Sequence, residues 1–120
     1  MTKSERELIR NMFNGHCAYC GKKLCKTFHV DHVKPMQRGI PGASERDKEA
    51  VKYPSCKRCN LWKKTYSIEQ FRAEIANQVE RVRRESAGFR LAENFGLIAE
   101  ITGPVEFYFE RFAPESECPF

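Results

Sequence analysis

Two short-spaced cysteine pairs constrain this chain more than any other feature of its sequence. Cys17 and Cys20 form the first pair, with two residues between them, and Cys56 and Cys59 form the second. Two such pairs on separate loops supply the four thiolates of a tetrahedral zinc site. We therefore predict one structural zinc ion that joins two loops lying far apart in the sequence.

The size of the chain favours the same interpretation. The 120 residues fit a single α+β domain over 1–120, with a core small enough for a bound metal to add useful stability. The N-terminus carries charges where a signal peptide would be apolar, and no apolar stretch is long enough to cross a bilayer. We expect a cytoplasmic protein with no membrane partner, whose cysteines stay reduced and bind metal.

Charge is distributed unevenly along the chain. Positions 1–90 hold 20 Lys and Arg against 10 Asp and Glu, whereas positions 91–120 hold one Arg against six Glu. A basic body of this kind is typical of proteins that meet phosphate backbones, although many basic proteins bind no nucleic acid. The charge alone is therefore a weak indication of a DNA partner.

Hydrophobic periodicity and turn residues predict the order of the secondary structure. In the first half of the chain we expect a helix capped by Ser4, a strand over 26–33, an exposed loop over 36–50 and an extended segment over 51–55. One long amphipathic helix is expected over 68–82, and it begins with a capping box at Ser67 and Gln70. A short helix over 89–95 and a strand over 104–110 are expected to follow. Strand alternation places His29 and Asp31 on one face of the first strand and His32 on the other.

Asp31 and His32 place a carboxylate beside an imidazole in the segment between the cysteine pairs. Such a pair can be an ordinary ion pair at a strand end. Its position between two expected zinc-binding loops favours a catalytic role instead. Asn60 follows the second cysteine pair, and two lysines come one helical turn later. A catalytic metal ion and an anionic substrate are expected beside this segment.

The motifs, taken in order, resemble the zinc-containing branch of the HNH endonucleases. They are Cys17-x-x-Cys20, Val30-Asp31-His32-Val33-x-Pro35, a glycine-bearing loop, and Cys56-x-x-Cys59-Asn60-x-x-Lys63. The resemblance covers about residues 14–72, and the extension over 73–120 is similar to small stand-alone members found in phages and bacteria. It implies a ββα element, in which two strands and a helix grip one divalent ion above the structural zinc, flanked by further helices.

The resemblance also implies a role for each matching residue. Asp31 and Asn60 would bind a catalytic Mg²⁺ or Mn²⁺, hard ions that keep several waters, and His32 would be the general base. The family's middle asparagine, which braces the loop and orients the base, falls on Val51 in this chain. The sequence therefore departs from the family at the group that orients the base, while Asp31 and Asn60 keep two metal-ligand positions. The family's following ligand position, one helical turn later, holds Lys64 in this chain.

The same residues fit the chemistry of phosphodiester hydrolysis. This reaction needs a base to deprotonate water, a cation to stabilise the growing negative charge, and groups that position the phosphate. His32 can be the base, because imidazole exchanges protons near neutral pH. Arg58, Lys63 and Lys64 are expected to contact DNA backbone phosphates, and His29 is a secondary candidate for contact with the metal or the phosphate.

We therefore expect a metal-dependent DNA endonuclease that nicks or cuts duplex DNA. Two alternatives remain at this point. One is a catalytically weak or inactive zinc-stabilised DNA-binding module, which Val51 favours. The other is a zinc-dependent interaction protein whose partner surface lies around Phe107–Phe112. A homodimer also remains open, because the apolar stripe from Ile68 to Val82 can serve either a core or a dimer interface.

Overall fold

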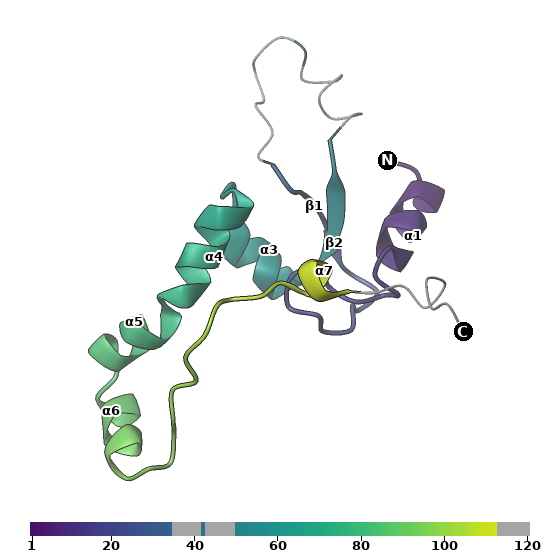
Figure 1. Ribbon diagram of the computed structural model, residues 1–120. Helices are drawn as coiled ribbons and strands as arrows, with labels where there is room; N and C mark the ends of the chain where they lie inside the picture. The colour runs from purple at the N-terminus through teal and green to yellow at the C-terminus, as the bar shows by residue number, and fades with distance from the viewer. Residues whose placement is uncertain (35–41, 43–49, 113–120) are drawn as a thin grey trace.

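The computed structural model describes residues 1–34, 42 and 50–112, so most of the loop expected over 36–50 lies outside the described residues. The elements, in chain order, are α1 (Lys3–Asn11), β1 (His29–His32), β2 (Lys52–Ser55), α3 (Lys57–Lys63), α4 (Ile68–Ala76), α5 (Gln78–Glu85), α6 (Ala87–Asn94) and α7 (Tyr108–Arg111) (Figure 1). Within the described residues, the protein is thus a mixture of helices and one small sheet, as the sequence predicts.

The sheet consists of β1 and β2, which pair antiparallel. Val30 lies opposite Pro54, and Asp31 lies opposite Tyr53. Both expected extended segments are confirmed, although β1 is shorter than the predicted strand. Helix α3 follows β2 directly and begins at its N-cap, Cys56, so the order is strand, strand, helix.

The first cysteine loop lies between β2 and the C-terminal segment. The Ala18 N–H donates to the Pro54 carbonyl at 2.9 Å, and the Ala18 carbonyl accepts from the Phe109 N–H at 2.8 Å. The Tyr19 carbonyl accepts from the Tyr108 N–H at 2.9 Å. These backbone hydrogen bonds hold three segments side by side that are far apart in the sequence.

Aromatic rings make up most of the core. Phe71 stacks on Phe107 with 5.4 Å between ring centroids, and the Tyr19 ring meets both edge-on at 5.6 Å. Such pairs contribute beyond their burial, which suits a core with few members. The buried cluster consists of Cys17, Tyr19, Leu24, Phe28, Phe71 and Phe107. Phe107 is 1% exposed and belongs to this core, whereas a partner surface around Phe107–Phe112 stays a prediction.

The structure corrects three details of the predicted elements. The N-cap of α1 is Thr2, which forms a capping box with Glu5, so the cap at Ser4 is wrong. The helix expected over 68–82 is divided at Asn77 into α4 and α5. At this break the side-chain amide of Gln78 donates to the Glu74 carbonyl at 2.7 Å, which competes with the regular backbone bond of a continuous helix. The capping box at the start of α4 is confirmed.

The strand expected over 104–110 is the third correction. The chain there is extended only up to Phe107 and then forms the short helix α7. The Glu110 carboxylate accepts the Phe107 N–H at 2.9 Å, which caps the turn, and pairs with both terminal nitrogens of Arg72 at 2.8 Å. This side chain therefore favours a helical turn that alternation of apolar residues does not reveal.

Helices α5 and α6 extend away from the sheet and the cysteine loops, and the chain returns from α6 as a long extended segment (Figure 1). Helix α5 packs against α4 and α6. None of the helices in the described ranges combines the length and the apolar character needed to cross a membrane.

Candidate metal centre and the Asp31–His32 segment

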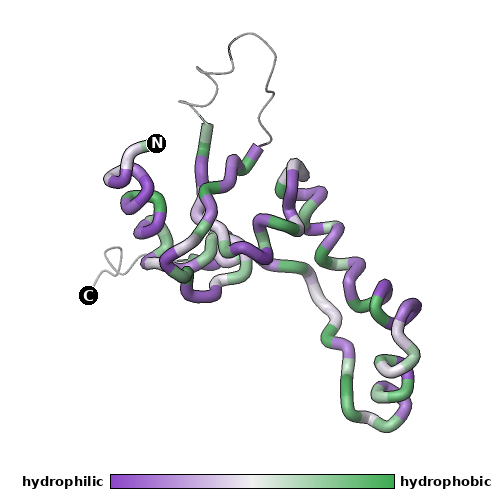
Figure 2. Tube along the Cα trace, turned by 180° about the vertical axis from the view of Figure 1, so that it is seen from behind, coloured by the Kyte–Doolittle hydropathy of each residue, from purple (hydrophilic) through white to green (hydrophobic). Residues whose placement is uncertain are grey.

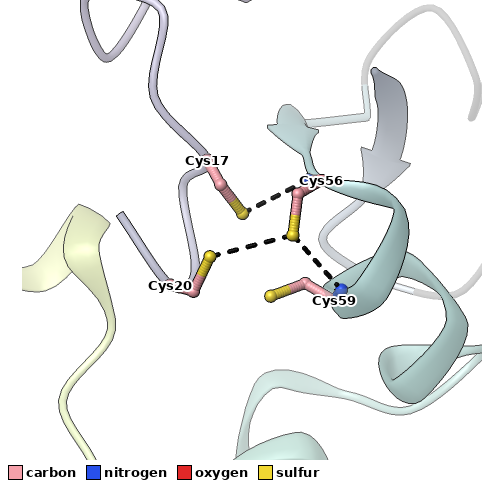
Figure 3. Close-up of side chains that lie close together, drawn as sticks. All are labelled: Cys17, Cys20, Cys56 and Cys59. Atoms are coloured by element: carbon pink, nitrogen blue, oxygen red, sulfur yellow. Dashed lines mark hydrogen bonds between the residues drawn. The ribbon is translucent and has the colours of Figure 1, made fainter. Parts of the chain in front are cut away.

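The four paired cysteines come together, as the sequence predicts. Their sulfur atoms all lie within 4.8 Å of one another, and those of Cys20 and Cys56 are 3.7 Å apart (Figure 3). A tetrahedral site with Zn–S bonds of about 2.3 Å has S–S edges of roughly 3.8 Å. The donor set and the spacing therefore fit a metal ion such as zinc, held by Cys17, Cys20, Cys56 and Cys59.

Local backbone structure presents these sulfurs toward one another. A tight turn returns the Gly21 N–H to the Cys17 carbonyl at 3.0 Å, and Gly21 has φ of +80°. A Cβ at Gly21 would lie 2.8 Å from the Tyr108 ring, so glycine also permits the close approach of α7. On the other side, Cys56 is the N-cap of α3 and its sulfur accepts the Cys59 N–H at 3.4 Å.

Contacts among Cys17, Cys20 and Cys59 shift the pKa values of their thiols in opposite directions. Hydrogen bonds from Cys20 and then Cys59 lower the pKa of the Cys17 thiol, despite its burial. The same contact with Cys17 raises the pKa of Cys20 to about 11, and contacts with Cys17 and Cys20 raise that of Cys59. Four thiolates need a compensating cation, so metal binding and the release of their protons are coupled at this site.

Asp31 lies on β1 and is turned into the interior, where it is 7% exposed. Its Oδ2 accepts the Tyr19 hydroxyl at 2.5 Å and lies 2.9 Å from the Lys63 ammonium nitrogen. Burial, followed by the hydrogen bond to Asp31, raises the pKa of Tyr19, so this phenol stays a neutral donor. Tyr19, Asp31 and Lys63 thus form a buried polar triad, which links the first cysteine loop to the sheet and to α3.

Lys63 differs most from its expected place. We expected an exposed cation for DNA phosphates, but the side chain is 1% exposed. In addition to pairing with Asp31, its ammonium donates to the carbonyl of His32 at 3.1 Å. Lys63 is therefore unavailable to a phosphate in this structure. Arg58 and Lys64, the other two expected DNA contacts, are exposed on and just after α3.

The other predicted site residues lie on the two elements that Lys63 connects. His32 is half-buried at the end of β1, and His29 is exposed at its start. Asn60 is half-buried on α3, one helical turn before Lys63. Successive strand residues face opposite sides, so Asp31 and His32 point in different directions from the strand. Metal binding by Asp31 and Asn60 and proton transfer by His32 stay predictions.

Tyr19 is the functional candidate that sequence reasoning missed. Its position between two metal-binding cysteines indicates only that it is close to the cluster. No local pattern indicates that its hydroxyl reaches Asp31, because that contact depends on how the loop docks on the sheet. Val51 occupies the expected middle-asparagine position. Its apolar side chain is 57% exposed and does not brace the loop as an asparagine would.

Comparison with models of protein families, with curated proteins and with solved structures found no match to this chain.

Proposed function

We propose that this protein is a metal-dependent DNA endonuclease of the HNH type. The observation that carries the proposal is the order β1, β2, α3, with the cysteine cluster at the junction of β2 and α3. Asp31 and His32 end β1, and Asn60 lies on α3, which contacts β1. The residues that the resemblance assigns to catalysis therefore lie on adjacent elements of one small scaffold.

In the proposed reaction, His32 takes a proton from a water molecule as this attacks the phosphorus of a phosphodiester. Attack in line with the leaving 3′ oxygen gives 5′-phosphate and 3′-hydroxyl ends. Mg²⁺ or Mn²⁺ held by Asp31 and Asn60 would supply positive charge at the scissile phosphate. The exposed cations Arg58 and Lys64 would contact neighbouring backbone phosphates.

The buried triad is compatible with metal binding by Asp31. Within the described part of the chain, the contacts of Tyr19 and Lys63 both fall on Oδ2, so an ion would bind this carboxylate through Oδ1. Lys63 also holds the carbonyl of His32. One ammonium group therefore restrains both the proposed ligand and the backbone of the proposed base, which is how buried partners position a catalytic group.

A plasmid-nicking assay tests the proposal. Purified zinc-loaded protein should relax or linearise supercoiled plasmid in Mg²⁺ or Mn²⁺ and lose this activity when a chelator removes the added metal. His32→Ala should lower cleavage by roughly 10²- to 10⁴-fold, the usual range for a lost general base. The matched control is His16→Ala, which removes the remaining histidine of the chain, outside β1 and the proposed site.

Two results would contradict this assignment. If the wild-type chain leaves the plasmid intact in both metals, the enzyme proposal fails. If His16→Ala and His32→Ala lower the rate equally, His32 has no special role as the base.

A DNA-binding module without strong catalysis is the second candidate. Two observations favour it: Val51 occupies the expected asparagine position, and the Lys63 ammonium already compensates the charge of Asp31. This candidate predicts a salt-dependent gel shift with duplex DNA and an intact plasmid under every metal condition.

A further inference from the structure

The segment over 78–103, which we call the arm, consists of α5, α6 and the extended chain that follows them. It leads away from the sheet and the cysteine cluster (Figure 1). Among the larger contacts between described elements, α5 meets α4 and α6, and α6 meets only α5. Within the described residues, little of the chain outside the arm is therefore available to cover its apolar side chains.

Exposed apolar side chains are concentrated on the arm. It contains seven of the thirteen large hydrophobic residues that are exposed in the described chain, and Figure 2 shows hydrophobic positions recurring along both helices and the returning segment. Leu97 is 78% exposed and Ile101 is 95% exposed. The seven residues are Val79, Val82, Leu91, Phe95, Leu97, Ile98 and Ile101. Such a concentration on a soluble monomer usually indicates an interaction surface.

Charged side chains of the arm pair mostly with one another, apart from Arg81, which pairs with Glu74 on α4 at 2.8 Å. Arg83 on α5 bonds Glu93 on α6 at 2.8 Å and Glu100 on the returning segment at 2.6 Å. Arg90 donates to the backbone carbonyl of Arg83 at 2.7 Å. These contacts tie the three parts of the arm together. Its four arginines balance its four glutamates, so the arm is neutral on a chain of net charge +5.

We propose that the arm forms a symmetric dimer interface with the arm of a second copy of this chain. A neutral apolar surface has no charge to attract DNA, and it is where two chains of the same positive charge meet with the least repulsion. The sequence allowed the apolar stripe from Ile68 to Val82 to be either core or dimer interface. Part of it is core, because Phe71 is buried and Ile75 packs against the buried hydrophobic cluster.

The exposed area of the arm, summed over all seven residues, is of the size that a standard dimer interface buries. The seven side chains expose the equivalent of about four whole residues. At roughly 150–200 Å² for a large apolar residue, this is about 600–850 Å² per copy. A standard interface buries about 800 Å² per partner. An isologous contact uses the same surface twice, so one arm is sufficient to form the whole interface.

Sedimentation equilibrium of the full zinc-loaded chain, from about 1 to about 100 μM, tests the proposal. The wild type should reach twice the 14.0 kDa of one chain, with a dissociation constant of about 10 μM or tighter. Leu97→Glu should weaken the dimer at least about 100-fold, because a symmetric interface carries each change twice. Ile101→Glu, at a second exposed position, should do the same.

The matched control is Leu8→Glu, which places the same charge at an exposed leucine on α1, 72% exposed and outside the arm. It should dimerise like the wild type, and all variants should keep their zinc content and helical circular dichroism. A wild type that stays monomeric at the highest concentration would overturn the proposal. So would arm variants that dimerise normally, or a Leu8→Glu variant that loses the dimer. These outcomes are independent of nuclease activity, since the proposal does not rest on it.

Discussion

Replacing Lys63 by methionine should destabilise the fold far more than an ordinary lysine substitution. Met has a similar length but no charge, so Lys63→Met removes the cation 2.9 Å from Asp31 and the donor to the His32 carbonyl. The carboxylate would be left 7% exposed beside an apolar side chain. Removing one partner of a buried ion pair costs about 3–5 kcal/mol, a large part of the roughly 5–15 kcal/mol that stabilises a typical domain.

Urea denaturation of the zinc-loaded proteins, with zinc in excess throughout, measures this effect. With a slope of about 2 kcal/mol per M, the midpoint of Lys63→Met should fall by roughly 1.5–2.5 M. The control is the neighbouring exposed residue: Lys64→Met should change the free energy of unfolding by less than about 0.5 kcal/mol. The double variant with Asp31→Asn should recover part of the loss, because no charge is then left unpaired.

The buried triad is refuted if Lys63→Met and Lys64→Met lower the midpoint equally. A single variant too unstable to purify agrees with the prediction, and the double variant then provides the test. If Asp31→Asn adds its full cost to that of Lys63→Met, the two side chains do not interact in solution.

Two further predictions concern the cysteine cluster and the C-terminal contact. Cys56→Ser should release zinc and lower the melting temperature of the whole domain, because metal binding and folding are coupled; zinc content that stays at the wild-type level would exclude Cys56 as a ligand. Hydrogen bonds from Arg72 lower the pKa of Glu110 below its ordinary value of 4.5. The stability gained from this pair is therefore present above about pH 4.5 and lost as the pH falls through the lower pKa of the folded state. Wild type and Glu110→Gln should differ most in melting temperature above pH 4.5 and converge in acid, and a constant difference would contradict the pair.

The sequence predicts the elements that depend on local spacing well. Two residues between paired cysteines are enough to present both sulfurs to one metal ion, so the cluster of Cys17, Cys20, Cys56 and Cys59 follows from residue type and spacing. Capping chemistry is equally local, and the box at Ser67 is confirmed for that reason. The extended segment before the second cysteine pair is also local, because the proline at position 54 disfavours helix in the residue before it.

Tertiary packing decides which side of each element becomes the interior. Alternation separates Asp31 from His32 but does not say which of the two is buried. Helical spacing likewise leaves open whether Lys63 or Lys64 turns inward. The docking of α3 on β1 and of the first cysteine loop on the sheet settles both, because Tyr19 and Lys63 converge on one carboxylate oxygen only in the assembled fold. The exposed arm has the same origin, since an apolar pattern shows that a face can be buried and only the arrangement of the other elements shows whether the chain covers it.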